Sequence, residues 1–354
     1  MNNALQEILL VPPPHLMKDR IFELEGELRS YEVAKPMQVL RYKLKRKGFD
    51  LKTIDMSKEP KNAIAVVFSD LPKKNDTYYQ FCIKNKLQDK MYLIIGEPPA
   101  TRPDCYDQKL HGEFKGVSTF STELIDNKKY FYYNYVLPIQ YGEKVMIPRN
   151  KFESQKLLCN ISGNKFSSHS NELYGERVKA IDFMEKYHPE DFDLYGTGWE
   201  KPMIHARWAS ALKINGMIWR FWPKNIKIKQ FKTHKGPHSK KGLLQKYKFT
   251  IAYENCITNG YISEKILEAM LYGTVPIYSG DPNIEKRIPK DCFIDKRDFK
   301  NYESLYRFIS SMDKKTHDGY LDRIEKFLNS KKAYPFTINA FVDNFENMLS
   351  IERY

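Results

Sequence analysis

The stretch YKFTIAYENCITNGYISEKILEAMLYGTVPIYSGDP, from Tyr247 to Pro282, places an amphipathic segment between two apolar ones. KFTIAY is rich in β-branched and aromatic residues and predicts a buried strand that ends before Glu254. From Ser263 to Gly273 the apolar residues recur at helical spacing, and TVPIY then predicts a second strand. A strand, a helix and a strand in this order predict a parallel βαβ unit.

The predicted helix begins with a charge that its own dipole disfavours. Ser263 is a good N-cap and Glu264 suits the helix start, whereas Lys265 in the first turn costs about 0.3–1 kcal/mol. That cost disappears where the free N–H groups and the ammonium group bind an anion together. A carboxylate beside them can accept hydrogen bonds from a ribose diol. The pair indicates a nucleoside diphosphate, with ribose on Glu264 and phosphate near Lys265. The alternative is an ordinary helix with two exposed charges.

Strands and helices alternate along most of the chain, which predicts two Rossmann-like α/β domains. We expect domain boundaries at 1–150, 151–335 and 336–354, with the last segment a helix that crosses back to the first domain. The first thirty-odd residues are weakly helical in periodicity and predict a peripheral element. Residues 98–126 are rich in Pro and polar residues and predict an extended region. Strands are expected at 50–56, 63–70, 91–99, 156–162 and 191–199, and helices at 37–48, 78–88, 169–187, 304–312 and 316–330.

The composition is that of a packed protein with a basic excess. Of the 354 residues 42% are hydrophobic and 14% aromatic, and the formal net charge is +14. This balance indicates an anionic partner or, equally, a lysine-rich proteome. The most basic tract, Lys224 to Lys246, predicts a loop and a short helix.

The cysteines and the apolar runs indicate in which cellular compartment the protein is expected. Five cysteines lie scattered without metal-ligand spacing, which favours reduced thiols in the cytoplasm over a disulfide framework or a zinc site. The apolar run LLVPPP is too short for a signal peptide and is broken by prolines. No apolar run reaches membrane-spanning length, so we expect any membrane contact to be peripheral, at an anionic surface.

The order of residues in the opening stretch resembles the donor-binding signature of the α-1,3/4-fucosyltransferase family. The matching elements are Glu254-Asn255, Tyr261, Glu264-Lys265, the helix, and the VPIY-x-G strand end. The resemblance continues to Phe299 and includes Pro289, Phe293 and Asp298. Residues 159–199, with Arg177 on their helix, and the segment IIGEPP, with Glu97, are weaker matches upstream.

The resemblance implies a GT-B glycosyltransferase, in which two Rossmann-like domains face each other across a cleft. Such an enzyme would move fucose from GDP-fucose to a hydroxyl of a glycan acceptor, inverting the anomeric centre, with no obligatory metal. One general base must then deprotonate the acceptor hydroxyl. The resemblance gives this role to Glu97, whose pKa partial desolvation would raise. The alternative is a capping or salt-bridged carboxylate.

The resemblance also assigns roles in donor binding to individual residues. Arg177 and Lys265 would neutralise the leaving diphosphate. Tyr261 would line the sugar or phosphate site, or pack as a core aromatic. Asn255 would bind donor phosphate or cap the loop, and Glu254 would bind donor or be structural.

Other patterns in the chain point away from metal and nucleic acid. Asp191-Phe-Asp193 mimics the DxD of metal-dependent transferases but leads directly into a strand, so we expect it to be non-catalytic. The histidines at 188, 205, 234 and 238 show no metal spacing. Two alternatives to GDP-fucose transfer remain: a transferase of another nucleotide sugar, and a basic nucleic-acid-binding protein. Little aromatic interleaving in the basic tract argues against the second, so no nucleic-acid partner is expected.

Overall fold

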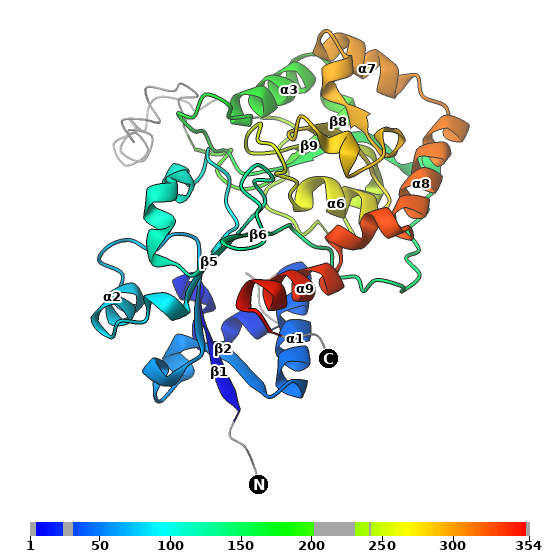
Figure 1. Ribbon diagram of the computed structural model, residues 1–354. Helices are drawn as coiled ribbons and strands as arrows, with labels where there is room; N and C mark the ends of the chain where they lie inside the picture. Colours follow the sequence, from blue (N-terminus) through cyan, green and yellow to red (C-terminus); the bar gives the residue numbers. More distant parts are fainter. Residues whose placement is uncertain (1–4, 24–30, 202–230, 241, 352–354) are drawn as a thin grey trace. The chain divides into compact units, whose positions relative to one another are not determined.

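A computed structural model describes residues 5–23, 31–201, 231–240 and 242–351 of the chain. The chain forms two compact units (Figure 1). Unit 1 comprises Met1–Glu143 and Tyr334–Tyr354, and unit 2 comprises Lys144–Ala333. The predicted boundaries follow residues 150 and 335, and the structure places them after residues 143 and 333. Among the described helices, none is both long enough and apolar enough to cross a bilayer.

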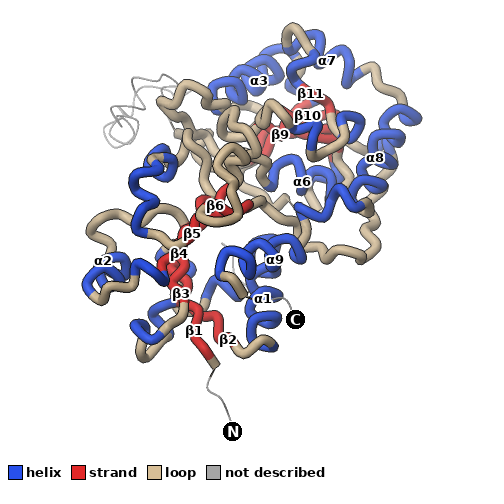
Figure 2. Tube along the Cα trace, in the orientation of Figure 1, coloured by secondary structure: helices blue, strands red, loops and turns tan. Residues whose placement is uncertain are grey.

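Unit 1 is built on a six-stranded parallel sheet with the order β2-β1-β3-β4-β5-β6 (Figure 2). Its strands are β1 (Gln6–Val11), β2 (Phe49–Thr53), β3 (Ala65–Ser69), β4 (Met91–Ile95), β5 (Gly116–Thr119) and β6 (Tyr130–Tyr132). Its described α-helices are α1 (Tyr31–Arg46), α2 (Thr77–Lys84) and α9 (Ile338–Leu349). The parallel α/β architecture predicted for this part of the chain is confirmed.

The prediction of a peripheral helical element at the start of the chain is wrong. Gln6–Val11 is β1, which pairs with β2 on one side and β3 on the other. Ile8 and Leu10 pack into the cluster with α1 and α9, while Leu9 and Val11 pack into the cluster on the opposite face. Because both faces are covered, β1 carries a continuous apolar run without alternation. Periodicity cannot distinguish such a short run from a buried helix segment.

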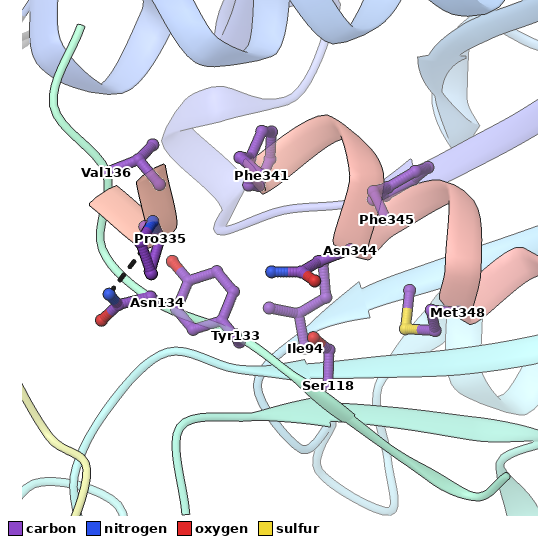
Figure 3. Close-up of a pocket in the computed structure, with 10 residues that line it drawn as sticks. All are labelled: Ile94, Ser118, Tyr133, Asn134, Val136, Pro335, Phe341, Asn344, Phe345 and Met348. Atoms are coloured by element: carbon purple, nitrogen blue, oxygen red, sulfur yellow. Dashed lines mark hydrogen bonds between the residues drawn. The ribbon is translucent and has the colours of Figure 1, made fainter. Parts of the chain in front are cut away.

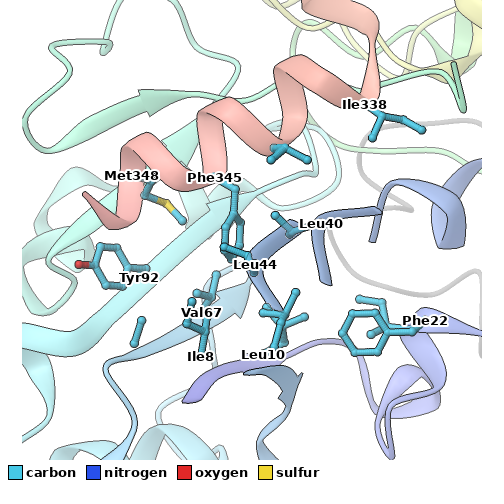
Figure 4. Close-up of a cluster of buried hydrophobic side chains, with 14 residues drawn as sticks. Ile8, Leu10, Phe22, Leu40, Leu44, Val67, Tyr92, Ile338, Phe345 and Met348 are labelled. Atoms are coloured by element: carbon cyan, nitrogen blue, oxygen red, sulfur yellow. The ribbon is translucent and has the colours of Figure 1, made fainter. Parts of the chain in front are cut away.

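The C-terminal helix α9 completes the core of unit 1. Its apolar face joins the cluster formed by β1, β3 and α1 (Figure 4), contributing Ile338, Val342, Phe345 and Met348. The approach to α9 is fixed by backbone bonds, since Leu137 N–H donates to the Phe336 carbonyl at 2.8 Å. The helix that the sequence predicts to cross back therefore packs within unit 1.

Unit 2 contains a five-stranded parallel sheet with the order β11-β10-β9-β7-β8. The strands are β7 (Lys156–Ile161), β8 (Phe192–Tyr195), β9 (Tyr247–Tyr253), β10 (Val275–Ser279) and β11 (Ile294–Asp295). The described α-helices are α3 (Tyr174–Tyr187), α6 (Glu264–Leu271), α7 (Tyr302–Ser310) and α8 (Lys314–Leu328). Strand β9 lies at the centre of the sheet. The predicted βαβ unit is confirmed as β9, α6 and β10, with β9 and β10 parallel neighbours.

Candidate donor-nucleotide site

The carboxyl ends of β9 and β10 meet at one edge of the sheet in unit 2. Glu254 follows β9, Gly280-Asp281 follows β10, and α6 begins at Glu264. In open α/β sheets this edge is where ligands bind. The structure therefore brings most of the predicted donor residues to the edge of the sheet where ligands bind in such folds.

The start of α6 is held by a buried carboxylate. Ser263 is the N-cap, as predicted, and its hydroxyl accepts the Lys265 N–H at 3.4 Å. The Glu254 carboxylate in turn accepts the Ser263 N–H at 2.8 Å and the Ser263 hydroxyl at 2.5 Å. Both Glu254 and Ser263 are fully buried. A Cβ at Gly280 would lie 2.4 Å from Cγ of Glu254, so only glycine fits over this carboxylate. These contacts give Glu254 a structural position beneath the loop.

The ammonium group of Lys265 is surrounded by oxygen atoms. Its Nζ lies 3.0 Å from the Ser263 hydroxyl, 3.5 Å from Oε2 of Glu254 and 3.6 Å from Oε1 of Glu264. Two carboxylates therefore offset the unfavourable interaction of this lysine with the helix dipole. The Lys265 side chain is 17% exposed, so it is fixed in place while part of it still faces solvent.

Glu264 has a second cationic neighbour that the sequence does not reveal. Lys240, from the loop before β9, lies 3.6 Å from Oε1 of Glu264 and 2.5 Å from Oε2 of Glu268. Burial alone would raise the pKa of Glu264, but the ammonium groups of Lys265 and Lys240 lower it to about 2. The Glu264 side chain is 39% exposed. It is therefore an ionised, accessible acceptor of hydrogen bonds, as binding a diol requires.

Arg177 on α3 contacts the backbone at the carboxyl end of β9. Its Nη2 group donates to the carbonyls of Tyr253 at 2.7 Å and Glu254 at 3.1 Å. The residue is 4% exposed, and burial lowers its pKa from the usual arginine value. Arg177 thus fixes the backbone at the end of β9. Its direct contact with a diphosphate stays a prediction.

Two further predicted residues line the loop between β9 and α6. Tyr261 is buried, and its backbone carbonyl accepts a hydrogen bond from the Tyr278 hydroxyl at 3.5 Å. Asn255 is partly buried, and its carbonyl accepts the Leu173 N–H at 3.0 Å, just before α3. Both residues therefore help to hold the loop, and their contact with donor stays a prediction.

Glu97 lies in unit 1, two residues beyond the end of β4, and is partly buried. The Asp70 carboxylate accepts the N–H groups of Gly96 at 3.0 Å and Glu97 at 3.4 Å. The hydroxyls of Tyr106 and Tyr135 donate to the carbonyls of Glu97 and Gly96, each at 2.9 Å. Burial raises the pKa of Asp70, which sits in the left-handed region with φ of +60°. The backbone that carries Glu97 is thus fixed on both sides. Neither Asp70 nor the two tyrosines follow from the sequence pattern.

The two aspartates of Asp191-Phe-Asp193 make hydrogen bonds and an ion pair within unit 2. Asp193 is buried, accepts the Tyr247 hydroxyl at 2.6 Å and pairs with Lys156 at 3.0 Å. Asp191 accepts the Tyr306 hydroxyl at 2.7 Å. Within the described ranges, no three His, Cys, Asp or Glu side chains are grouped to hold a metal ion. The basic tract is described only at 231–240 and 242–246, so its remainder lies outside the described residues.

A separate hollow lies within unit 1, between α9 and the strand ends of β4 to β6 (Figure 3). Aromatic rings and amide or hydroxyl groups share its wall. None of the predicted site residues lines it. The residues that do are Ile94, Ser118, Tyr133, Asn134, Val136, Pro335, Phe341, Asn344, Phe345 and Met348.

The buried Glu254 predicts a pH-dependent stability. Burial raises its pKa, so the folded chain holds this proton more tightly than the unfolded chain does. The stability of the native state therefore falls as pH rises from the ordinary glutamate value through the raised one, by up to about 1.4 kcal/mol per pH unit. Glu254→Gln removes the titration. We expect urea unfolding of the variant to lack this slope, while Glu153→Gln, at an exposed position, keeps it. An equal slope in both variants would assign the effect elsewhere.

The chain has the GT-B fold, which solved structures share. A solved α1,3-fucosyltransferase superposes with a TM-score of 0.54 at 14% identity, covering 100% of this chain and 93% of that one. HepE of Anabaena, solved with UDP, gives a TM-score of 0.52 at 11% identity and covers 98% and 100%. At these identities the likeness establishes the fold.

The sequence of unit 2 is similar to a known family. Residues 162–334 match the model of glycosyltransferase family 10 (fucosyltransferase), C-terminal domain, and this range contains all the predicted donor residues. The α-(1,3)-fucosyltransferase FucT of Helicobacter pylori is 37% identical over 100 residues, which are 27% of this chain. GDP-fucose protein O-fucosyltransferase 3 of Gallus gallus is 34% identical over 122 residues, 30% of this chain. The predicted resemblance to fucosyltransferases is confirmed by these matches.

The similar segments are a small part of those relatives. The chain covers 20% of the Helicobacter pylori protein and 26% of the Gallus gallus protein.

Proposed function

We propose that the chain is an inverting glycosyltransferase that moves L-fucose from GDP-fucose to a hydroxyl of a glycan acceptor. One observation carries the proposal. The family 10 match includes the start of α6. There an ionised Glu264 lies beside Lys265, whose ammonium group is held by neighbouring oxygen atoms at the helix N-terminus. This pair suits a ribose diol and a diphosphate, the two polar parts of a nucleotide sugar.

In the proposed reaction the donor diphosphate leaves from one face of the sugar while the acceptor oxygen attacks from the other. Negative charge develops on the leaving GDP, and the Lys265 ammonium stabilises it from a position already fixed by Ser263 and Glu254. Arg177 holds the backbone end of β9, on which this arrangement rests. Glu97 removes the proton of the acceptor hydroxyl as the new bond forms.

The donor is tested by thermal unfolding with a panel of nucleotide sugars. A ligand that binds only the folded state raises the melting temperature, and the increase grows with the logarithm of its concentration relative to its dissociation constant. We expect GDP-fucose and GDP to stabilise the chain, and UDP-glucose and UDP-N-acetylglucosamine to leave it unchanged. A response to UDP compounds and none to GDP compounds would overturn the donor assignment and leave the fold intact.

The acceptor class is tested by measuring GDP release. Relatives in the family are named both for a galactosyl-N-acetylglucosaminide acceptor and for a protein acceptor. A panel therefore includes oligosaccharides that end in galactosyl-N-acetylglucosamine and unglycosylated protein domains. We expect GDP release from GDP-fucose to accelerate with an oligosaccharide. Acceleration by protein alone would retain fucosyl transfer and replace the glycan acceptor.

A further inference from the structure

Lys240 joins the basic loop before β9 to the first turns of α6. Its ammonium nitrogen lies 2.5 Å from Oε2 of Glu268 and 3.6 Å from Oε1 of Glu264. The two glutamates are one helical turn apart on the same face, so a single ammonium group reaches both. Residues 201–250 contain thirteen Lys and Arg and no Asp or Glu, yet in the described part of that segment Lys240 is the lysine paired with α6.

The two contacts of Lys240 differ in character. Glu268 is buried, with its side chain 7% exposed, whereas the Glu264 side chain is 39% exposed. Although burial disfavours the ammonium ion, the two carboxylates raise the pKa of Lys240 above its usual value, so it remains charged. The Glu268 contact therefore anchors the lysine, and the Glu264 contact is the more exposed of the two.

Both cations near Glu264 approach the same oxygen. Lys240 and Lys265 each lie 3.6 Å from its Oε1. A partly exposed glutamate otherwise samples several rotamers, and selecting one on ligand binding costs conformational entropy. Held by two ammonium groups, the carboxylate is arranged before the ligand arrives.

We propose that Lys240 is a positioning residue for the ribose end of the donor nucleotide. Anchored on Glu268, it holds the Glu264 carboxylate in the orientation that accepts hydrogen bonds from the ribose hydroxyls. This inference rests on the proposed function, in which Glu264 binds the diol of GDP. Lys240 itself touches neither sugar nor phosphate.

The test compares GDP with 2′,3′-dideoxy-GDP, which has the same base and diphosphate but lacks both ribose hydroxyls. Lys240→Met is expected to weaken GDP binding about tenfold in calorimetric titration, the size of one charge-assisted hydrogen bond. Binding of the dideoxy compound is expected to stay unchanged. Lys240→Arg restores GDP affinity because it keeps the charge. Lys246→Met, at an exposed position of the same segment, is the matched control and leaves both affinities as they are.

A double-mutant cycle locates the effect. In a Glu264→Ala background, adding Lys240→Met is expected to change GDP affinity no further. Equal weakening of GDP and dideoxy-GDP would make Lys240 a phosphate contact and overturn the proposal. A lower melting temperature with unchanged affinities would make it merely structural and overturn it too. Failure of the wild-type chain to bind GDP would instead reject the proposed function, which separates the two outcomes.

Discussion

Glu97→Gln is expected to abolish fucosyl transfer while leaving GDP-fucose binding intact. The glutamine keeps the size of the glutamate and its backbone bonds to Asp70 and Tyr106, while Tyr135 holds the neighbouring Gly96. It cannot accept the proton of the acceptor hydroxyl. General-base catalysis contributes about 10²–10⁴ in rate, so kcat is expected to fall by that factor. Steady-state GDP release with an active acceptor measures kcat, and calorimetry measures the dissociation constant of GDP-fucose.

Glu113→Gln is the control, because it changes a carboxylate of the same unit that lies outside the predicted site. The pH profile adds a second readout. In the wild-type chain log kcat rises with pH as the base loses its proton, and the variant lacks this limb. Normal turnover by Glu97→Gln would assign the base to another residue.

Lys265→Met is expected to weaken GDP binding by about 10–100-fold, which is the range for a charge-assisted phosphate contact. The loss should grow with the number of phosphates, so GDP suffers more than GMP. Guanosine suffers least, because it loses only the support that Lys265 gives to Glu264. Calorimetric titration with the three ligands gives this series directly. An equal loss for guanosine would show that Lys265 acts on the ribose through Glu264.

The same substitution removes the cation nearest to the buried Glu254 carboxylate. We therefore expect a loss of about 1–3 kcal/mol in the free energy of unfolding at neutral pH. The loss shrinks at acidic pH, where Glu254 binds a proton. Lys246→Met serves as the control, since it removes a charge from an exposed position of the same unit.

The helix of the donor site could be predicted almost residue by residue because its signals are local. Ser263 caps it, the apolar face repeats at helical spacing, and Gly273 follows its end with φ of +72°. A Cβ at Gly273 would lie 2.3 Å from the Pro148 carbonyl oxygen, so glycine is required there for packing as well as for conformation. Each of these features acts within a few residues of the helix.

The parts that could not be predicted depend on contacts between distant segments. Strand β5 is the short segment GVST, whose burial comes from its neighbours and not from an apolar run. Lys240 reaches Glu264 and Glu268 from a loop without periodicity, and Asp70 lies beneath Glu97 only because β3 and β4 are adjacent. The sequence predicts the candidate ligand-binding groups, and the tertiary structure shows which residues hold them in place.

The return of α9 to unit 1 has a consequence for the order in which the chain folds during synthesis. Unit 2 is one continuous segment, so all of its strands are available once residue 333 has left the ribosome. Unit 1 begins earlier but lacks Phe345 and Met348 of its core until α9 emerges. Domains fold as units as they are completed. Unit 2 is therefore expected to fold before the core of unit 1 is complete.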